Sequence, residues 1–248
     1  MDNITLANAT ITPGYWDLTG ASPLKATSAT PGPNDVPAIQ IKISESAGNN
    51  GGSLQLLFGS LMGISSVDLS ATAIAVVGSP SSVQPGDLFP MAMPQSDYSA
   101  YWDSSTNTPK LDPSTGQPYI FNLSEGTQGG WTSFAINTSN TSALESLIVN
   151  GNPTTLGIDD NVWITSGAKT AIYSYVPTNV NVLIAVTATS TPGTQQPIIA
   201  FAAAHIISSA GGPNKFIQVQ MTDNFKTPHD TPGGGINYGA YTSPRLTQ

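Results

Sequence analysis

The sequence predicts a mainly β protein with minor α content (α+β). A small β-α-β unit is expected first, followed by a larger antiparallel β domain, for which a sandwich is one candidate architecture. The chain holds 24 Gly and 20 Pro, and these turn residues divide it into short apolar runs, which is the pattern of a chain of strands. Several runs alternate apolar and polar residues, as half-buried strands do. Two segments show the apolar spacing of a helix.

Residues 1–77 are expected to form the small α/β unit. A short strand through Thr10 leads into a long loop. Residues 38–44 then alternate, with isoleucine at every second position, which predicts a strand. Residues 53–62 predict a helix with Ser53 as its N-cap, because apolar side chains recur at helical spacing at Leu54, Leu57, Phe58, Leu61 and Met62. A second strand over residues 66–77 completes the expected β-α-β crossover.

The remaining chain divides by composition into three parts. Residues 78–94 are proline-rich and are expected to be a linker, residues 95–221 to be the mainly antiparallel β domain, and residues 222–248 to be an irregular Gly-, Pro- and Tyr-rich tail. Within the β domain, residues 141–149 predict a short helix that Gly151 stops. Strands are predicted at residues 119–123, 131–136, 180–188, 197–208 and 215–221.

Residues 157–177 predict a hairpin at the centre of the β domain. A polar turn precedes Val162, Trp163 and Ile164, and Gly167 separates this run from a second one that is rich in β-branched and aromatic residues. Pro177 closes the second run because proline has no N–H to donate to a ladder. We therefore expect Trp163 to be buried.

Composition excludes several classes of function. Charged residues are 9% of the chain and the net charge is −8. The seven Lys and Arg are spread over 248 residues and cannot form a basic stripe along a phosphate backbone, which argues against nucleic-acid binding. For the same reason, binding to a membrane surface through a basic patch is disfavoured. The chain has no Cys, which removes disulfides, thiolate nucleophiles and thiolate zinc sites. No apolar run reaches the length of a transmembrane helix.

No catalytic, cofactor-binding or metal-binding residue is expected, and no cofactor. The two histidines, His205 and His229, lie far apart in an apolar strand and in the tail, and the pattern G-x-S-x-G is missing. The pattern S-x-x-K occurs at Ser22–Lys25 and Ser166–Lys169, which the many serines explain by chance. Two binding hypotheses stay open for residues 95–117. Calcium could bind at Asp97, Asp103, Asn107 and Asp112, and a sugar could stack on Tyr98, Tyr101 and Trp102.

Several stretches resemble the TadG-like proteins of Flp/Tad pilus assembly. The similarity covers nearly the whole chain and rests on structural patterns, not on catalytic signatures. The stretches that carry it are residues 15–17 (YWD), 38–43 (AIQIKI), 56–59 (LLFG), 63–64 (GI), 67–73 (VDLSATA), 157–177 (the predicted hairpin), 197–203 (PIIAFAA) and 237–248 (NYGAYTSPRLTQ).

This resemblance implies a non-enzymatic envelope component that takes part in pilus assembly, anchoring or surface adherence. It implies pilins, pseudopilins or other Tad envelope components as partners, and a periplasmic or cell-surface location. The family carries an N-terminal helix that anchors it in the inner membrane, and this chain starts after the position of that helix. We expect the 95–117 loop and residues 224–248 to carry the interaction surface. The alternative is a carbohydrate-binding adhesin or hydrolase on a β-sandwich.

Overall fold

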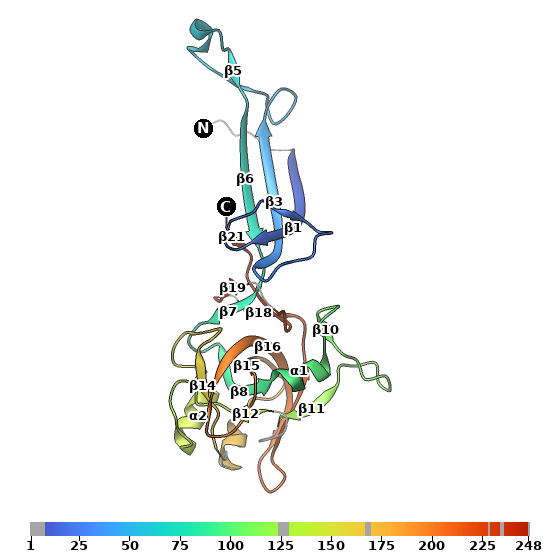
Figure 1. Ribbon diagram of the computed structural model, residues 1–248, viewed down its shortest axis with the longest axis vertical. Coiled ribbons are helices and arrows are strands. Elements are labelled where there is room, and N and C mark those ends of the chain that lie inside the picture. The colour runs from blue at the N-terminus through green and yellow to red at the C-terminus, as the bar shows by residue number, and fades with distance from the viewer. Residues whose placement is uncertain (1–7, 124–128, 167–169, 228, 234–235, 248) are drawn as a thin grey trace. The chain divides into compact units, whose positions relative to one another are not determined.

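A computed structural model describes residues 8–123, 129–166, 170–227, 229–233 and 236–247 (Figure 1). Strands make up 48% and helices 11% of the chain, which confirms a mainly β protein with minor α. The chain divides into two compact units. Unit 1 contains residues 1–77 and 244–248, and unit 2 contains residues 78–243.

Unit 1 is a five-stranded antiparallel sheet with the order β2-β1-β3-β6-β21. Its strands are β1 (Ala9–Asp17), β2 (Lys25–Ala26), β3 (Asp35–Glu45), β6 (Leu69–Val76) and β21 (Arg245–Leu246). Ile11 on β1 lies opposite Ile41 on β3, which lies opposite Ala73 on β6. The two long predicted strands are therefore neighbours in an antiparallel hairpin, and the expected β-α-β crossover is wrong.

The predicted helix over residues 53–62 is also wrong. This stretch contains β4 (Leu54–Gln55), a turn and the short 3-10 helix η1 (Gly59–Met62), and β4 pairs with β5 (Ser66–Val67). An amphipathic stretch gains most of its helical stability from packing its apolar face, and here Leu57 and Leu61 stay exposed. Gly59 fits the closed turn because a Cβ there would lie 1.9 Å from the carbonyl oxygen of Ile64.

The core of unit 1 occupies only one half of one sheet face. Buried side chains are Trp16, Val36, Ala38, Ile74 and Val76, and Leu18 and Leu24 pack against them. All five come from the half of the sheet that holds the end of β1, the start of β3 and the end of β6. The other half of the same face carries polar residues, so the sheet has one small core and long exposed stretches.

Unit 2 is built around a seven-stranded sheet with the path β11-β17-β16-β15-β8-β12, and β14 pairs with β16 beside it. These strands are β8 (Leu88–Pro94), β11 (Ile120–Leu123), β12 (Gly130–Trp131), β14 (Asn161–Trp163), β15 (Val180–Thr187), β16 (Gln195–Ala210) and β17 (Phe216–Met221). The pairing of β15 with β8 is parallel, and the other pairings in this sheet are antiparallel.

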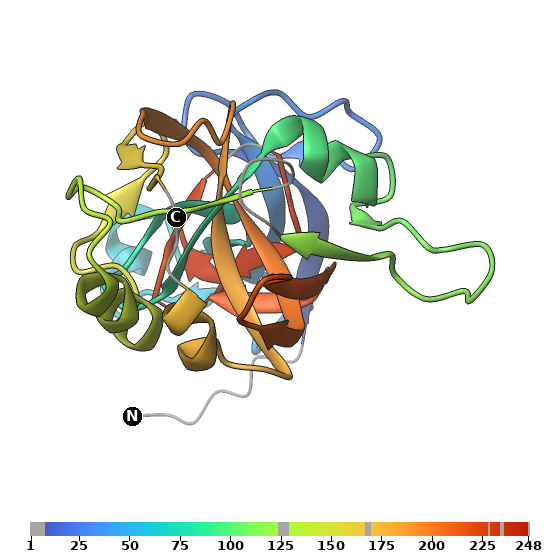
Figure 2. The same cartoon turned by 90° about the horizontal axis from the view of Figure 1, so that it is seen from below.

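Shorter elements surround this sheet. They are β7 (Ser79–Val83), α1 (Gln95–Tyr101), β9 (Trp102–Asp103), β10 (Thr108–Pro109), α2 (Thr141–Asn150), β13 (Leu156–Gly157), η2 (Thr170–Tyr175), β18 (Phe225–Thr227), β19 (Thr231–Gly233) and β20 (Ala240–Thr242). Helices α1 (green) and α2 (yellow-green) lie on opposite sides of the strands of unit 2 (Figure 2).

The predicted helix over residues 141–149 is confirmed as α2. The side chain of Asn140 accepts a hydrogen bond from the backbone N–H of Ala143, and the N–H of Gly151 donates to the carbonyl of Leu147 at 2.8 Å. These are the caps that a helix needs at its two ends. Leu144 and Ile148 are buried on the predicted apolar face.

Residues 78–94 are not a linker. They contain β7 and β8, and all seven residues of β8 are buried. Proline is tolerated at a bulge, and the ladder between β15 and β8 skips from Leu88 to Ala92, which leaves Pro90 in the skipped stretch. Residues 222–248 are likewise more than an irregular tail, because β18 to β21 lie there and Tyr238 and Ala240 are buried.

The predicted hairpin over residues 157–177 is half right. Its first part forms β14, but its second part forms the 3-10 helix η2 where a strand was expected; Gly167 to Lys169 lie outside the described residues. Trp163 is half-buried, whereas its neighbours Val162 and Ile164 are buried. Alternation along the strand turns the indole to the opposite side, so the expected burial of Trp163 is wrong.

Candidate functional site

The aromatic residues that suggested a sugar site lie mostly inside unit 2. Tyr98 and Trp102 are buried, and the hydroxyl of Tyr98 donates to the carbonyl of Tyr238 at 3.0 Å. Burial raises the pKa of Tyr98 far above its ordinary value. The ring of Tyr101 stacks on Phe121 with centroids 4.0 Å apart. These three side chains therefore do not form an exposed platform on which a sugar could stack.

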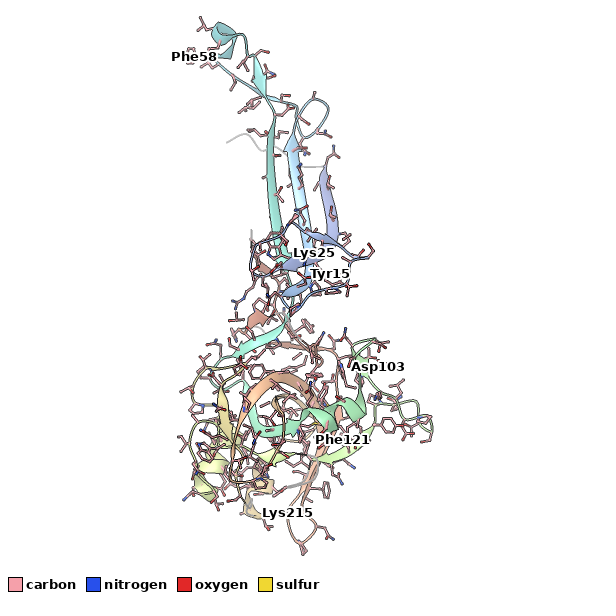
Figure 3. All side chains as sticks on the ribbon, in the orientation of Figure 1. Tyr15, Lys25, Phe58, Asp103, Phe121 and Lys215 are labelled. Atoms are coloured by element: carbon pink, nitrogen blue, oxygen red, sulfur yellow. The ribbon has the colours of Figure 1, made fainter. Side chains whose placement is uncertain are left out.

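The acidic residues of the 95–117 loop have local roles. Asp103 accepts hydrogen bonds from the backbone N–H and the hydroxyl of Ser105, and Asp112 does the same with Ser114. These hydrogen bonds lower the pKa of both carboxyls. Within the described part of the chain, no group of three or more His, Asp or Glu side chains could hold a metal ion. Asp103, which Figure 3 labels, is the second residue of β9 and pairs with Thr108 of β10.

The residues considered for acyl transfer or base catalysis are also engaged elsewhere. Lys25 forms an ion pair with Asp35, with its Nζ atom 2.7 Å from a carboxylate oxygen. Lys169 lies outside the described residues. His205 is partly exposed, and its Nδ1 lies 2.7 Å from the side-chain oxygen of Asn181. The partners of Lys25 and His205 are thus a carboxylate and an amide, and neither partner is a hydroxyl nucleophile.

One face of the unit 1 sheet is apolar between its charged ends, which are Asp17 and Asp35 at one end and Glu45 at the other, and this apolar part is largely uncovered. We call this the apolar face and define it by Ala9, Ile11, Pro13, Ile39, Ile41, Ile43, Ala71, Ala73 and Ala75, which share one side because directly paired residues project together. Ile11 is 64% exposed, Ile39 48% and Ile41 38%. Contiguous apolar surface of this kind marks interaction sites in soluble domains.

A hollow lies at the end of the apolar face nearest the unit 1 core. It has a volume of about 390 Å³, and its lining includes Pro13, Tyr15, Pro37, Ile39, Ala75 and Pro244. Tyr15 and the neighbouring Lys25 lie together in this region (Figure 3). An apolar hollow beside an apolar face is suited to receive a single side chain of a partner.

The hairpin that joins β3 to β6 ends in a second exposed apolar feature. We call residues 53–67 the apolar tip. Leu57 is 86% exposed, Leu61 84%, Met62 81% and Phe58 72%. Phe58 projects from the far end of the tip (Figure 3). No charged residue occurs between Ser46 and Val67. The sequence pattern identified these side chains as an apolar set, but it assigned them to the buried face of a helix.

Residues 2–75 match the model of a protein family described as "Putative Tad-like Flp pilus-assembly". Over this stretch the chain is similar to that pilus-assembly family. The match supports the resemblance to a Tad-system protein over these residues, which include every residue of the apolar face and of the apolar tip. It supports a role in pilus assembly and suggests an envelope location.

No curated protein and no solved structure matches the chain. Among the described residues, every helix is too short or too polar to cross a membrane.

Proposed function

We propose that this protein is a non-enzymatic envelope component that takes part in Flp/Tad pilus assembly. It would do so by binding another pilus component at the apolar face. The observation that carries the proposal is the position of this face, which lies within the residues that match the pilus-assembly family. Pilins, pseudopilins and other Tad envelope components are the proposed partners, at a periplasmic or cell-surface location.

The physical reason for a partner is the lack of a second layer. A sheet is stable when its apolar face is buried against another layer, and the described residues of unit 1 provide none on this side. Full burial of one exposed isoleucine contributes about 1.5–3 kcal/mol. Ile11, Ile39 and Ile41 are already partly buried, so each can contribute only a part of this amount and the three together a share of the binding free energy.

The scarcity of titratable groups supports a binding role over catalysis. Enzymes gather ionisable side chains with perturbed pKa values in one cleft. The groups considered above instead interact with separate local partners. Lys25 forms an ion pair with Asp35, and the carboxylates of Asp103 and Asp112 accept hydrogen bonds from Ser105 and Ser114. The burial of Tyr98 and Trp102 also removes the aromatic set that favoured a carbohydrate-binding adhesin.

Two neighbouring residues of β1 allow a matched test. Ile11 and Thr12 are both exposed and project to opposite sides of the sheet. Ile11→Lys should reduce surface pili and surface attachment in a strain that depends on this protein, because a buried unpaired charge opposes association. Thr12→Lys adds the same charge to the other face and should leave both unchanged. Cross-linking of the wild-type protein in cells should recover a pilus component, and Ile11→Lys should lose it.

Normal piliation by Ile11→Lys, in a strain whose deletion mutant lacks pili, would contradict the proposed contact. A deletion mutant with normal pili and normal attachment would contradict the proposed function itself.

A further inference from the structure

We propose that the apolar tip inserts into a lipid bilayer, with Leu57, Phe58, Leu61 and Met62 entering the apolar layer of an electrically neutral membrane surface. This inference goes beyond the proposed function, because it assigns a lipid surface to residues that the partner contact does not use. The proposal rests on four features of the tip, which are its exposure, its hydrogen bonding, its charge and its connection to β1.

The first feature is the arrangement of the exposed side chains. The four residues span a turn and the helix η1, and each of them exposes 72–86% of its surface. Leu54 and Ile64, which flank them, are 48% and 54% exposed. The tip is thus a projection that is apolar on several sides. A protein partner would need a deep complementary cavity, whereas a fluid hydrocarbon layer adapts to a projection of this shape.

The second feature is the internal hydrogen bonding of the tip backbone. The N–H of Leu56 donates to Ser65, that of Gly59 to Leu56 and that of Ile64 to Gly59, over distances of 2.9–3.2 Å. The N–H of Leu61 donates to Phe58 at 3.2 Å. Backbone groups that enter hydrocarbon need partners within the protein, because water is not available there. The fold of the tip supplies several of these partners while its apolar side chains stay outside.

The third feature is the distribution of charge. The stretch from Ser46 to Val67 is uncharged, and the first charges on either side of it are the acidic Glu45 and Asp68. The hydroxyl of Ser53 donates to the carboxylate of Asp68 at 2.5 Å, which places a polar group at the base of the tip. Acidic flanks are repelled by anionic headgroups. The charge pattern therefore points to zwitterionic lipid and sets a limit to the depth of insertion.

The fourth feature is the path of the chain into β1. Ala9 pairs with Ile43 at the end of the sheet from which the tip extends. Asn50, in the same hairpin loop, accepts a hydrogen bond from the N–H of Asn8 at 2.9 Å and donates to its carbonyl at 2.8 Å. These two hydrogen bonds tie the hairpin loop at Asn50 to the start of β1, so the tip extends from an end of the sheet that is held in place.

Flotation of the full chain with vesicles tests the proposal directly. The wild-type protein should float with phosphatidylcholine vesicles, and high salt should not release it. Substitution of Leu57, Phe58 and Leu61 by serine should weaken binding by roughly tenfold or more, because three apolar side chains are lost. The matched control is Ile11→Ser with Ile39→Ser, which removes apolar surface from the apolar face and should leave binding unchanged.

A second readout locates the inserted residue and does not depend on the stability of the triple variant. Phe58→Trp should add fluorescence that brominated phosphatidylcholine quenches, and Thr12→Trp should add fluorescence that it does not quench. The single variant Leu57→Ser should weaken flotation while keeping the wild-type circular dichroism spectrum.

Four results would overturn the proposal. The first two are that the wild-type protein does not float with the vesicles, or that the triple variant floats as well as the wild type. The third is that the wild type binds only to vesicles that contain phosphatidylglycerol. The fourth is that sedimentation shows self-association through the tip while no flotation occurs. Normal piliation of Ile11→Lys together with normal flotation of the wild type would contradict the partner contact alone, so the two proposals fail separately.

Discussion

The Nζ atom of Lys25 lies 2.8 and 2.7 Å from the two carboxylate oxygens of Asp35. Asp35 is buried at the start of β3, and one of its oxygens also accepts a hydrogen bond from the N–H of Gly32 at 2.6 Å. This carboxylate therefore joins β2 and the loop before β3 to the rest of the unit 1 sheet.

Asp35 should stabilise unit 1 in a pH-dependent way. The hydrogen bond from Lys25, followed by that from Gly32, lowers the pKa of Asp35 below its ordinary value of 3.8. Its contribution to the free energy of unfolding is therefore present above pH 3.8 and is lost as the pH falls through the lowered pKa of the folded state. Denaturant unfolding should show Asp35→Asn to be less stable than the wild type at neutral pH, with a difference that shrinks in acid. A difference between the two proteins that stays constant from neutral pH into acid would contradict this role of Asp35.

Asp230 should have the opposite pH dependence. It is fully buried, its Oδ1 accepts a hydrogen bond from the N–H of Gln84 at 3.0 Å, and its Oδ2 has no partner among the described residues. Burial, and less strongly the nearby Asp87, raises its pKa above 3.8. The folded state therefore loses stability as the pH rises above 3.8 through the raised pKa. Asp230→Asn should gain stability relative to the wild type over this range. A constant difference between the two proteins from acid to neutral pH would contradict the assignment.

Two tryptophans of unit 2 should differ in their contribution to stability. Trp131 is 1% exposed and packs edge-on against Tyr173, with ring centroids 5.7 Å apart. Trp131→Ala should lower the free energy of unfolding by about 3–5 kcal/mol, the usual range for a core aromatic. Trp163 is half-buried, so Trp163→Ala should cost less than half as much. Equal losses in urea unfolding would show that the two side chains are buried to the same degree.

Deletion of the whole 95–117 segment should unfold unit 2. The segment contains α1 and carries Tyr98 and Trp102, which are part of the main core cluster. Residues 113–116 are exposed, so their deletion should change the melting temperature little. Pilus display by this shorter deletion tests whether the loop carries an interaction, because the fold is preserved. Cooperative thermal unfolding of the larger deletion near the wild-type temperature would contradict this view of the core.

Elements with their own local signals could be predicted from the sequence. Helix α2 has its stop at Gly151 and an apolar face through Leu144 and Ile148, and each of these appears in the sequence. The alternation over residues 38–44 predicted a strand within β3 in the same way. Such signals are local and do not depend on what the element packs against.

Properties that depend on the rest of the fold could not be predicted. Leu57 and Leu61 have the spacing of a buried helix face, but nothing in the spacing says whether another element covers them. The prolines of residues 78–94 suggested a linker because proline weakens a strand assignment, and Pro90 is tolerated because it lies in the irregular part of β8 in the β15–β8 ladder. The alternation of apolar and polar residues in the sequence indicated an apolar face. That this face is exposed could be established only from the structure of the sheet.

Unit 1 is assembled from both ends of the chain, with unit 2 connected between β6 and β21. Because the ribosome makes the N-terminus first, β1, β3 and β6 emerge long before β21. Until β21 arrives, Ala75 and Val76 lack the strand that pairs with them, and Ile74 lacks the hydrogen bond that its carbonyl accepts from Thr247. A nascent chain that stalls during synthesis of unit 2 therefore displays an open strand edge, which can pair with another chain. Synthesis of β21 is therefore expected to protect the nascent protein against aggregation.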